Sequence, residues 1–232
     1  MPNHRLRSLY RRRGTGAVNL VLHGHWRSSA AYRVRIALNL KGLDFAQVPH
    51  DLRGGEQHAP AYVAIAPQAR VPSLETDAGV LTQSLAIIEW LDEAHPLPPL
   101  LPADPTDRAV VRAMAQLVAC DIHPLNNLSV LQWLRKELGA NKDEVTRWTA
   151  QWITQGFAAL EVMISRHGGV FAFGDAPTLA DCCLVPQLYS ARRFGVDLRE
   201  FPRTVAAGDA CAALPACVAA DPAAQPDADV TH

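Results

Sequence analysis

In the first part of the chain the spacing of hydrophobic residues changes twice, from that of a strand to that of a helix and back. Residues 18–22 (VNLVL) form a short apolar run, which is typical of a buried strand, and Ala31–Lys41 repeat their apolar positions at helical spacing. Gly42 ends that helix, and the pattern over Leu43–Val48 predicts a second strand. Because a strand–helix–strand order favours a right-handed crossover, we expect the two strands to be parallel neighbours.

A hairpin and a second helix follow. Residues 70–83 (RVPSLETDAGVLTQ) predict two antiparallel strands joined at Asp77–Gly79. The next segment predicts a helix with Ser84 as its N-cap, an apolar face turned inward, and Pro96 just beyond its end. Pro72 interrupts the first strand of the hairpin, and this position favours a cis peptide bond.

The stretch 96–105 (PLPPLLPADP) cannot form regular structure, and it marks a domain boundary. Beyond it the pattern is helical throughout. One helix begins at Thr106 and Asp107 and is expected to kink at Pro124, and another covers Asp143–Ser165.

We expect α/β structure followed by an all-α domain. Thr178 and Asp181 have the spacing of a capping box at the start of a further helix. The predicted organisation is a disordered basic tail or start-site extension at 1–17, domains at 18–96 and 106–222 joined by a linker at 97–105, and a loose tail at 223–232.

Composition narrows the possible functions. Of the 232 residues, 49% are hydrophobic and 19% charged, and the formal net charge is -1, so nothing global favours nucleic acid or a membrane as partner. The five cysteines are odd in number and lack a CxxC pair, which favours reduced thiols and a cytoplasmic protein. No cluster has metal-ligand spacing, and the sequence predicts no metal site. Among the thiols, Cys120 is expected to be buried rather than to face a cleft.

Two predicted helix starts carry hydroxyl groups that suit an anion. Ser28 and Ser29 precede the first helix and Arg33 lies within it, while Gln83 and Ser84 open the helix after the hairpin. Free N–H groups at a helix N-terminus favour negative charge, and serine hydroxyls add donors there. The alternative at each place is that the serine only caps its helix.

Several motifs in one order resemble the zeta-class glutathione transferases, which include maleylacetoacetate and maleylpyruvate isomerases. They are RSSAAYRVRIALNLKG, RVPSLETD, QSLAIIEWLDE, LLPADP, DIHPLNNLSVL, GDAPTLADCCLVPQ and ARRFGVDL, and the resemblance covers about residues 18–226. It implies a thioredoxin-like N-terminal domain, an all-helical glutathione-transferase C-terminal domain, a cytoplasmic homodimer, and glutathione as cofactor.

The resemblance also implies roles for single residues. Ser29 would stabilise the thiolate of glutathione, with Ser28 as the close alternative and Arg27 assisting. Arg27, His123 and Arg193 would bind a small dicarboxylate substrate. Glutathione would be bound by Ser28, Ser29, Arg33, Gln57, Val71, Gln83, Ser84, His123, Asn127, Leu128 and Ser129.

The activity implied is cis-trans isomerisation of a maleyl diketo acid to its fumaryl isomer by reversible thiolate addition, in the catabolism of aromatic amino acids or other aromatic compounds. His123, where animal members carry glutamine, favours the maleylpyruvate type. The sequence departs from the family's pattern at the position after the paired serines, where Ala30 replaces the family's usual cysteine. The nucleophile would be the sulfur of glutathione itself, so this loss leaves isomerisation possible.

Two other functions stay open. A general glutathione transferase or dehalogenase acting on small electrophiles would share every glutathione-binding residue, although the pair Arg27 and Arg193 favours a diacid. A non-catalytic interaction module of the same fold would be expected to lose the serine sites at the two helix starts, and both are present.

Overall fold

The computed structural model describes residues 19–229, and the basic segment predicted at 1–17 lies outside them. The first half forms a four-stranded sheet in the order β2-β1-β3-β4, built from β1 (Val21–Gly24), β2 (Ala46–Pro49), β3 (Ser73–Thr76) and β4 (Gly79–Thr82). β1 pairs with β2 in parallel and with β3 antiparallel, and β3 and β4 form the predicted hairpin.

Two long helices complete this domain, α1 (Ser29–Leu40) and α3 (Ser84–Ala94), and a short helix, α2 (Pro60–Val63), follows the turn η2 (Glu56–His58). The strand expected over residues 18–22 is shifted toward the C-terminus, because His23 and Gly24 belong to the pairing with β2. The second strand likewise begins at Ala46 rather than Leu43.

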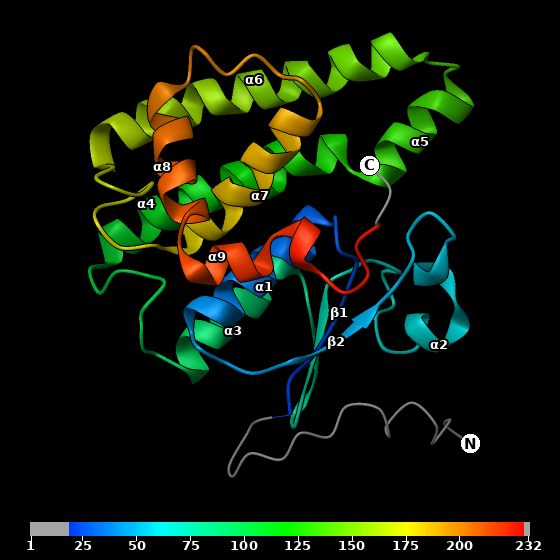
Figure 1. Cartoon of the computed structure of the whole chain (residues 1–232), viewed down its shortest axis with the longest axis horizontal. Helices are drawn as coiled ribbons and strands as arrows, with labels where there is room; N and C mark the ends of the chain where they lie inside the picture. Colours follow the sequence, from blue (N-terminus) through cyan, green and yellow to red (C-terminus); the bar gives the residue numbers. More distant parts are fainter. Residues whose placement is uncertain (1–18, 230–232) are drawn as a thin grey trace.

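The second half is helical, as expected (Figure 1). Its helices are α4 (Pro105–Gln116), α5 (Leu128–Glu137), α6 (Lys142–His167), α7 (Leu179–Arg193), α8 (Pro202–Ala212) and α9 (Pro215–Ala220), and it ends in the turn η5 (Pro222–Ala224). The capping box at the start of α7 is present, with the Thr178 side chain accepting from the helix and the Asp181 carboxylate accepting from the Thr178 backbone.

The helix that was predicted to kink at Pro124 loses its α-helical geometry earlier, at Leu117. α4 gives way to a π-helical segment, η3 (Leu117–Ile122), and then to the 3₁₀ segment η4 (His123–Asn126). Proline has no N–H to donate and its ring crowds the preceding turn, so the chain leaves α-helical geometry before it reaches Pro124. This irregular stretch places His123 beside the first domain.

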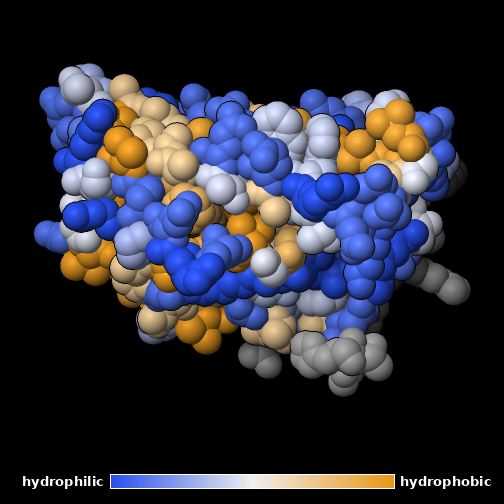
Figure 2. Space-filling model, turned by 90° about the horizontal axis from the view of Figure 1, so that it is seen from above, coloured by the Kyte–Doolittle hydropathy of each residue, from blue (hydrophilic) through white to orange (hydrophobic). Residues whose placement is uncertain are grey.

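The two domains share one hydrophobic core. Leu22 and Val34 from the sheet and α1 belong to the same buried cluster as Met114 and Leu184 from the helical half. α1 packs against both α7 and α9, so it lies at the contact between the domains. Hydrophilic side chains cover much of the helical face in Figure 2, interrupted by separate hydrophobic patches. Within residues 19–229 no helix is long and apolar enough to cross a membrane.

The C-terminal tail differs from its prediction. Residues 223–229 were expected to be loose, yet Gln225 is buried and its side-chain amide donates to the carbonyl oxygens of Ala219 and Asp221. Asp227 accepts a hydrogen bond from the backbone N–H of Trp26, next to the start of α1. The tail is rich in Ala, Pro and Asp, and it is fixed by polar contacts to distant segments, which composition does not indicate.

Candidate active site

The start of α1 is the first component of the site. Ser28 is the N-cap of this helix, and its hydroxyl oxygen accepts from the backbone N–H of Ala31 at 3.3 Å. Ser29 is the first helical residue. Because a hydroxyl can donate while its oxygen accepts, the cap role of Ser28 leaves its proton available to a ligand.

The second component is formed by the turn before β3 and the junction between β4 and α3. The Val71–Pro72 peptide bond is cis, as predicted. Gln83 has a φ of 69° and is the N-cap of α3, without a side-chain cap bond. Ser84 was predicted to be that cap; it is instead the first helical residue, and its oxygen accepts from Nη1 of Arg33 at 3.2 Å.

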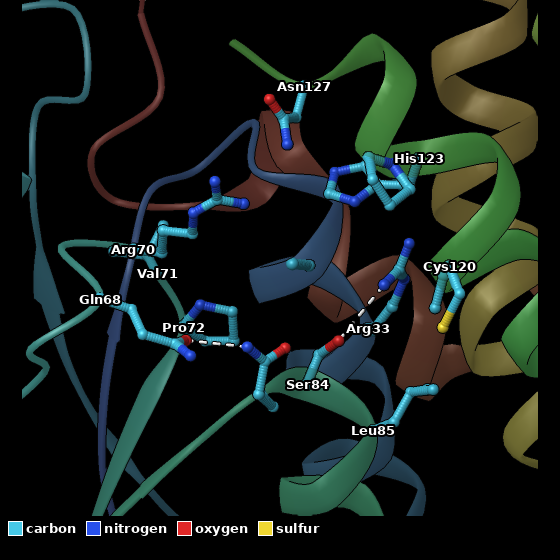
Figure 3. A pocket seen from close by; sticks show the side chains of 14 residues that line it. Arg33, Gln68, Arg70, Val71, Pro72, Ser84, Leu85, Cys120, His123 and Asn127 are labelled. Atoms are coloured by element: carbon cyan, nitrogen blue, oxygen red, sulfur yellow. Dashed lines mark hydrogen bonds between the residues drawn. The ribbon is translucent and has the colours of Figure 1, made fainter. Parts of the chain in front are cut away.

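These components meet the helical domain at a cavity of about 190 Å³ (Figure 3). Six of the predicted site residues line it: Arg33, Val71, Gln83, Ser84, His123 and Asn127. They come from α1, the cis-proline turn, α3 and the segment after α4, so residues far apart in sequence converge here. No acidic side chain is among the described residues that line the cavity.

Arg33 gives the cavity its charge. The residue is 2% exposed, and within residues 19–229 neither Nε nor Nη2 has a hydrogen-bond partner. Burial lowers the pKa of Arg33, yet an arginine in a protein stays protonated. Figure 3 shows its guanidinium between Ser84 and His123. A buried cation with unpaired donors is costly unless an anion satisfies it, so this group fits a ligand carboxylate.

His123 is held neutral in this environment. Burial, with the positive charges of Arg33 and Arg70, lowers the pKa of His123 to about 3. At neutral pH its ring therefore has one N–H donor and one acceptor nitrogen. The imidazole can hydrogen-bond to a ligand without adding a third positive charge to the cavity.

Gln68, Arg70 and Cys120 are polar residues of the cavity wall that were not among the predicted site residues. Oε1 of Gln68 accepts from Nε2 of Gln83 at 2.8 Å, and the guanidinium of Arg70 points across the cavity toward Asn127 (Figure 3). Their position just before the cis-proline was an available signal. Cys120 is exposed at the opposite wall, and the expectation of a buried thiol was wrong. The irregular backbone after α4 turns it outward.

The remaining predicted residues lie outside this cavity. Ser129 is in the first turn of α5, where its hydroxyl donates to Oδ1 of Asn127, the cap of that helix, at 2.7 Å. Leu128 is the first residue of that helix and Gln57 belongs to η2. Ser28 and Ser29 mark the adjoining mouth of α1.

Arg27 and Arg193 form a separate pair of cations. Arg27 immediately precedes the N-cap of α1 and Arg193 ends α7. Burial and the positive charge of Arg27 lower the pKa of Arg193. Each also lies over an aromatic ring: Arg27 4.9 Å from the centre of Trp26, and Arg193 4.3 Å from that of Phe194.

Comparison with known proteins agrees with this geometry. Residues 22–99 match the family model of the glutathione S-transferase N-terminal domain, and residues 143–219 match that of the C-terminal domain. Together with a sheet domain that carries a cis-proline turn and adjoins a helical domain across a cavity, these matches define the class: the chain belongs to the glutathione S-transferase family.

Individual relatives identify the class within this family. A maleylacetoacetate isomerase of Pseudomonas aeruginosa is 52% identical over 209 residues, covering 89% of this chain and 97% of the relative. The holo structure of a maleylpyruvate isomerase, described as a bacterial zeta-class enzyme, has a TM-score of 0.88 and 49% identity, covering 90% of this chain and all (100%) of that one.

A third relative was solved with ligands. The maleylacetoacetate isomerase of Methylobacterium extorquens AM1, with bound malonate and glutathione, has a TM-score of 0.86 and 40% identity, covering 90% of this chain and 99% of the other. The protein belongs to the zeta-class glutathione transferase family of maleylacetoacetate and maleylpyruvate isomerases.

Proposed function

We propose that this protein is a glutathione-dependent isomerase that converts a maleyl diketo acid, maleylacetoacetate or maleylpyruvate, to the fumaryl isomer. The observation that carries the proposal is the buried Arg33 guanidinium at the cavity between the domains, whose Nε and Nη2 have no hydrogen-bond partner among residues 19–229. Its chemistry requires an anionic ligand, and glutathione is bound in the related isomerase of M. extorquens.

Glutathione would lie along the cavity. Arg33, Ser84 and the N-terminus of α3 would bind one carboxylate, and the backbone of Val71 beside the cis-proline would pair with the peptide part. Gln83 and His123 would supply neutral donors and acceptors. When bound, glutathione supplies the thiolate that adds reversibly to the maleyl double bond, and it is regenerated at the end.

The mouth of α1 would favour that thiolate over the thiol. Free N–H groups of the first helical turn and the hydroxyls of Ser28 and Ser29 are hydrogen-bond donors to an anion, and Arg27 adds positive charge. We assign the direct contact to Ser29, as the family resemblance implies; Ser28 is the alternative, because its hydroxyl can still donate while its oxygen caps the helix.

Arg27 and Arg193 would bind the carboxylates of the substrate. A guanidinium group can bind a carboxylate by two parallel hydrogen bonds, and a diacid supplies one carboxylate for each arginine. They would also oppose the negative charge that builds up when the double bond is attacked. The binding of malonate by the M. extorquens relative agrees with a dicarboxylate ligand.

The test is isomerisation of maleylpyruvate and of maleylacetoacetate, followed by absorbance with and without glutathione. We expect glutathione-dependent turnover of at least one substrate, with a loss of about 100-fold in kcat for Ser29→Ala and a smaller loss for Ser28→Ala. Turnover that survives Ser29→Ala would transfer the thiolate contact to Ser28. Absence of turnover with both substrates would refute isomerisation and favour conjugation or dehalogenation.

A homodimer in the cytoplasm is part of the same proposal, and it rests on the family resemblance. Light scattering on the full chain tests the dimer: a mass twice that of one chain is expected, and a monomer over the whole concentration range would contradict it.

A further inference from the structure

The segment His25–Arg27 joins β1 to α1 and carries one of the proposed substrate-binding arginines. It also precedes Ser28, so the direction of its backbone decides where the hydroxyl and guanidinium groups at the helix mouth point. Segments of this kind are positioned by whatever fixes their peptide groups.

One side of the segment is held from within α1. The buried Arg35 guanidinium donates from Nη2 to the carbonyl oxygen of Trp26 at 2.8 Å and from Nη1 to that of His25 at 3.5 Å. Its Nε donates to the carbonyl oxygen of Ala220 at 3.0 Å, at the end of α9. Arg35 therefore ties the segment to the last helix of the protein.

The other side is held by the C-terminal tail. Oδ2 of Asp227 accepts from the backbone N–H of Trp26 at 2.9 Å. Both polar groups of the Trp26 backbone are thus used, the carbonyl by Arg35 and the N–H by Asp227. The two peptide planes that flank Trp26 are fixed as a result, and the second of them leads directly to Arg27.

The tail that delivers Asp227 is itself anchored. Oε1 of Gln225 accepts from Nε2 of Gln47 in β2 at 3.1 Å, whereas the ion pair of Asp229 with Arg53 at 2.6 Å is exposed and adds little to this anchoring. In Figure 1 the red segment after α9 runs from that helix toward the end of β1 where α1 begins. Asp227 therefore reaches Trp26 from a defined position.

We propose that Asp227 is a positioning residue of the isomerisation, which acts through the Trp26 backbone to orient Arg27 and Ser28 toward the reacting groups. This inference rests on the proposed function. A reaction that needs a thiolate and a diacid in one geometry is sensitive to small displacements of the groups that bind them. Loss of one backbone hydrogen bond at the helix mouth should therefore reduce turnover more than it reduces stability.

Three variants distinguish this positioning role of Asp227 from a purely structural role. Asp227→Ala removes the acceptor, Asp227→Asn keeps an acceptor oxygen without the charge, and Asp229→Ala removes the neighbouring tail carboxylate, whose ion pair is exposed. We would measure kcat and KM for the maleyl substrate, the pKa of the bound glutathione thiol from the ultraviolet absorbance of the thiolate, and the midpoint of thermal unfolding.

We expect Asp227→Ala to lower kcat/KM for the diacid by about tenfold, equivalent to about 1.4 kcal/mol, and to raise the thiol pKa of bound glutathione. Asp227→Asn should restore activity to within about twofold of the wild type, since its amide oxygen accepts the same bond. Asp229→Ala should match the wild type in activity and in thermal midpoint, and the thermal midpoint of Asp227→Ala should fall by no more than about 4 °C.

Full activity of Asp227→Ala would overturn the proposal, as would an equal loss in Asp229→Ala or in Asp227→Asn. A fall in thermal midpoint that accounts for the lost activity would assign Asp227 a purely structural role. If the wild type isomerises neither substrate, the proposed function fails by itself. The positioning role of Asp227 is then tested by the pKa of the bound glutathione thiol alone, because an unchanged value in Asp227→Ala would overturn it.

Discussion

Replacing Arg33 by methionine should stabilise the protein in the absence of glutathione. Its side chain is buried, and Nε and Nη2 lack a hydrogen-bond partner within the described part of the chain. A buried donor without a partner costs about 1–3 kcal/mol, so the two together cost about 2–6 kcal/mol. Loss of the bond to Ser84 offsets about 1 kcal/mol of this. We expect Arg33→Met to raise the free energy of unfolding by about 2 kcal/mol.

In the presence of glutathione, the wild type should instead be more stable than Arg33→Met. A hydrogen bond to a charged group contributes about 1.5–3 kcal/mol, so losing two should weaken glutathione binding by at least about 3 kcal/mol, or more than a hundredfold. The wild type gains about 2.7 kcal/mol of stability when glutathione is at about 100 times its Kd. The variant gains almost nothing at that concentration.

Denaturant unfolding followed by tryptophan fluorescence, with and without glutathione, measures both effects, and calorimetric titration gives the affinity. Arg35→Met is the matched control, because Arg35 lies on the same helix, is 1% exposed, and donates to three carbonyl oxygens. It should lower the free energy of unfolding by about 3 kcal/mol or more. If Arg33→Met is less stable than the wild type without glutathione, the reasoning from unpaired donors is wrong.

Three further outcomes can be checked. Native protein should react with one equivalent of a thiol reagent, because Cys120 is exposed and the other four cysteines are buried; Cys120→Ser should abolish the reaction, and saturating S-methylglutathione, which has no free thiol, should slow it in the wild type. The pKa of His123 is lowered to about 3 in the folded protein, against 6.5 ordinarily, so the unfolded chain binds more protons between these values. Stability from this group is therefore lost as pH falls from 6.5 toward 3, and His123→Gln should flatten that part of a pH series of unfolding curves. Arg193→Ala should raise KM for the maleyl diacid by about tenfold or more and leave conjugation of glutathione to an uncharged electrophile nearly unchanged, as steady-state kinetics would show.

The fold was largely predictable, because each element has a local pattern. The parallel pair, the hairpin and the helical second half follow from hydrophobic periods and turn residues that lie within a few positions of one another. The end of β1 was misplaced for a reason that is not local. His23 is a polar residue buried in the sheet, where its ring nitrogens lie 2.9 Å from His50 and 2.8 Å from Glu75. Neither partner is near it in sequence.

The site was predictable where a single turn carries the chemistry. The cis-proline and the hydroxyl at the start of α3 follow from short motifs, and both face the cavity. Arg70 and Cys120 were missed, because their exposure depends on how the turn and the irregular helix face each other across the domain contact. The fixed tail was missed for the same reason, since the partner of Asp227 is 201 positions away.

The pair Arg33 and Arg35 shows what the local sequence pattern does not determine. In the sequence YRVRIAL both interrupt one apolar helix in the same manner, and both are buried in the folded protein. Two residues span about 200° of an α-helix, so the two side chains leave it on nearly opposite sides. One meets three carbonyl oxygens, from the segment before the helix and from the end of α9, and becomes part of the scaffold. The other meets a cavity and keeps two unpaired donors. The proposed binding role of Arg33 therefore follows from the lack of acceptors for Nε and Nη2 among residues 19–229, which only the three-dimensional arrangement of both domains determines.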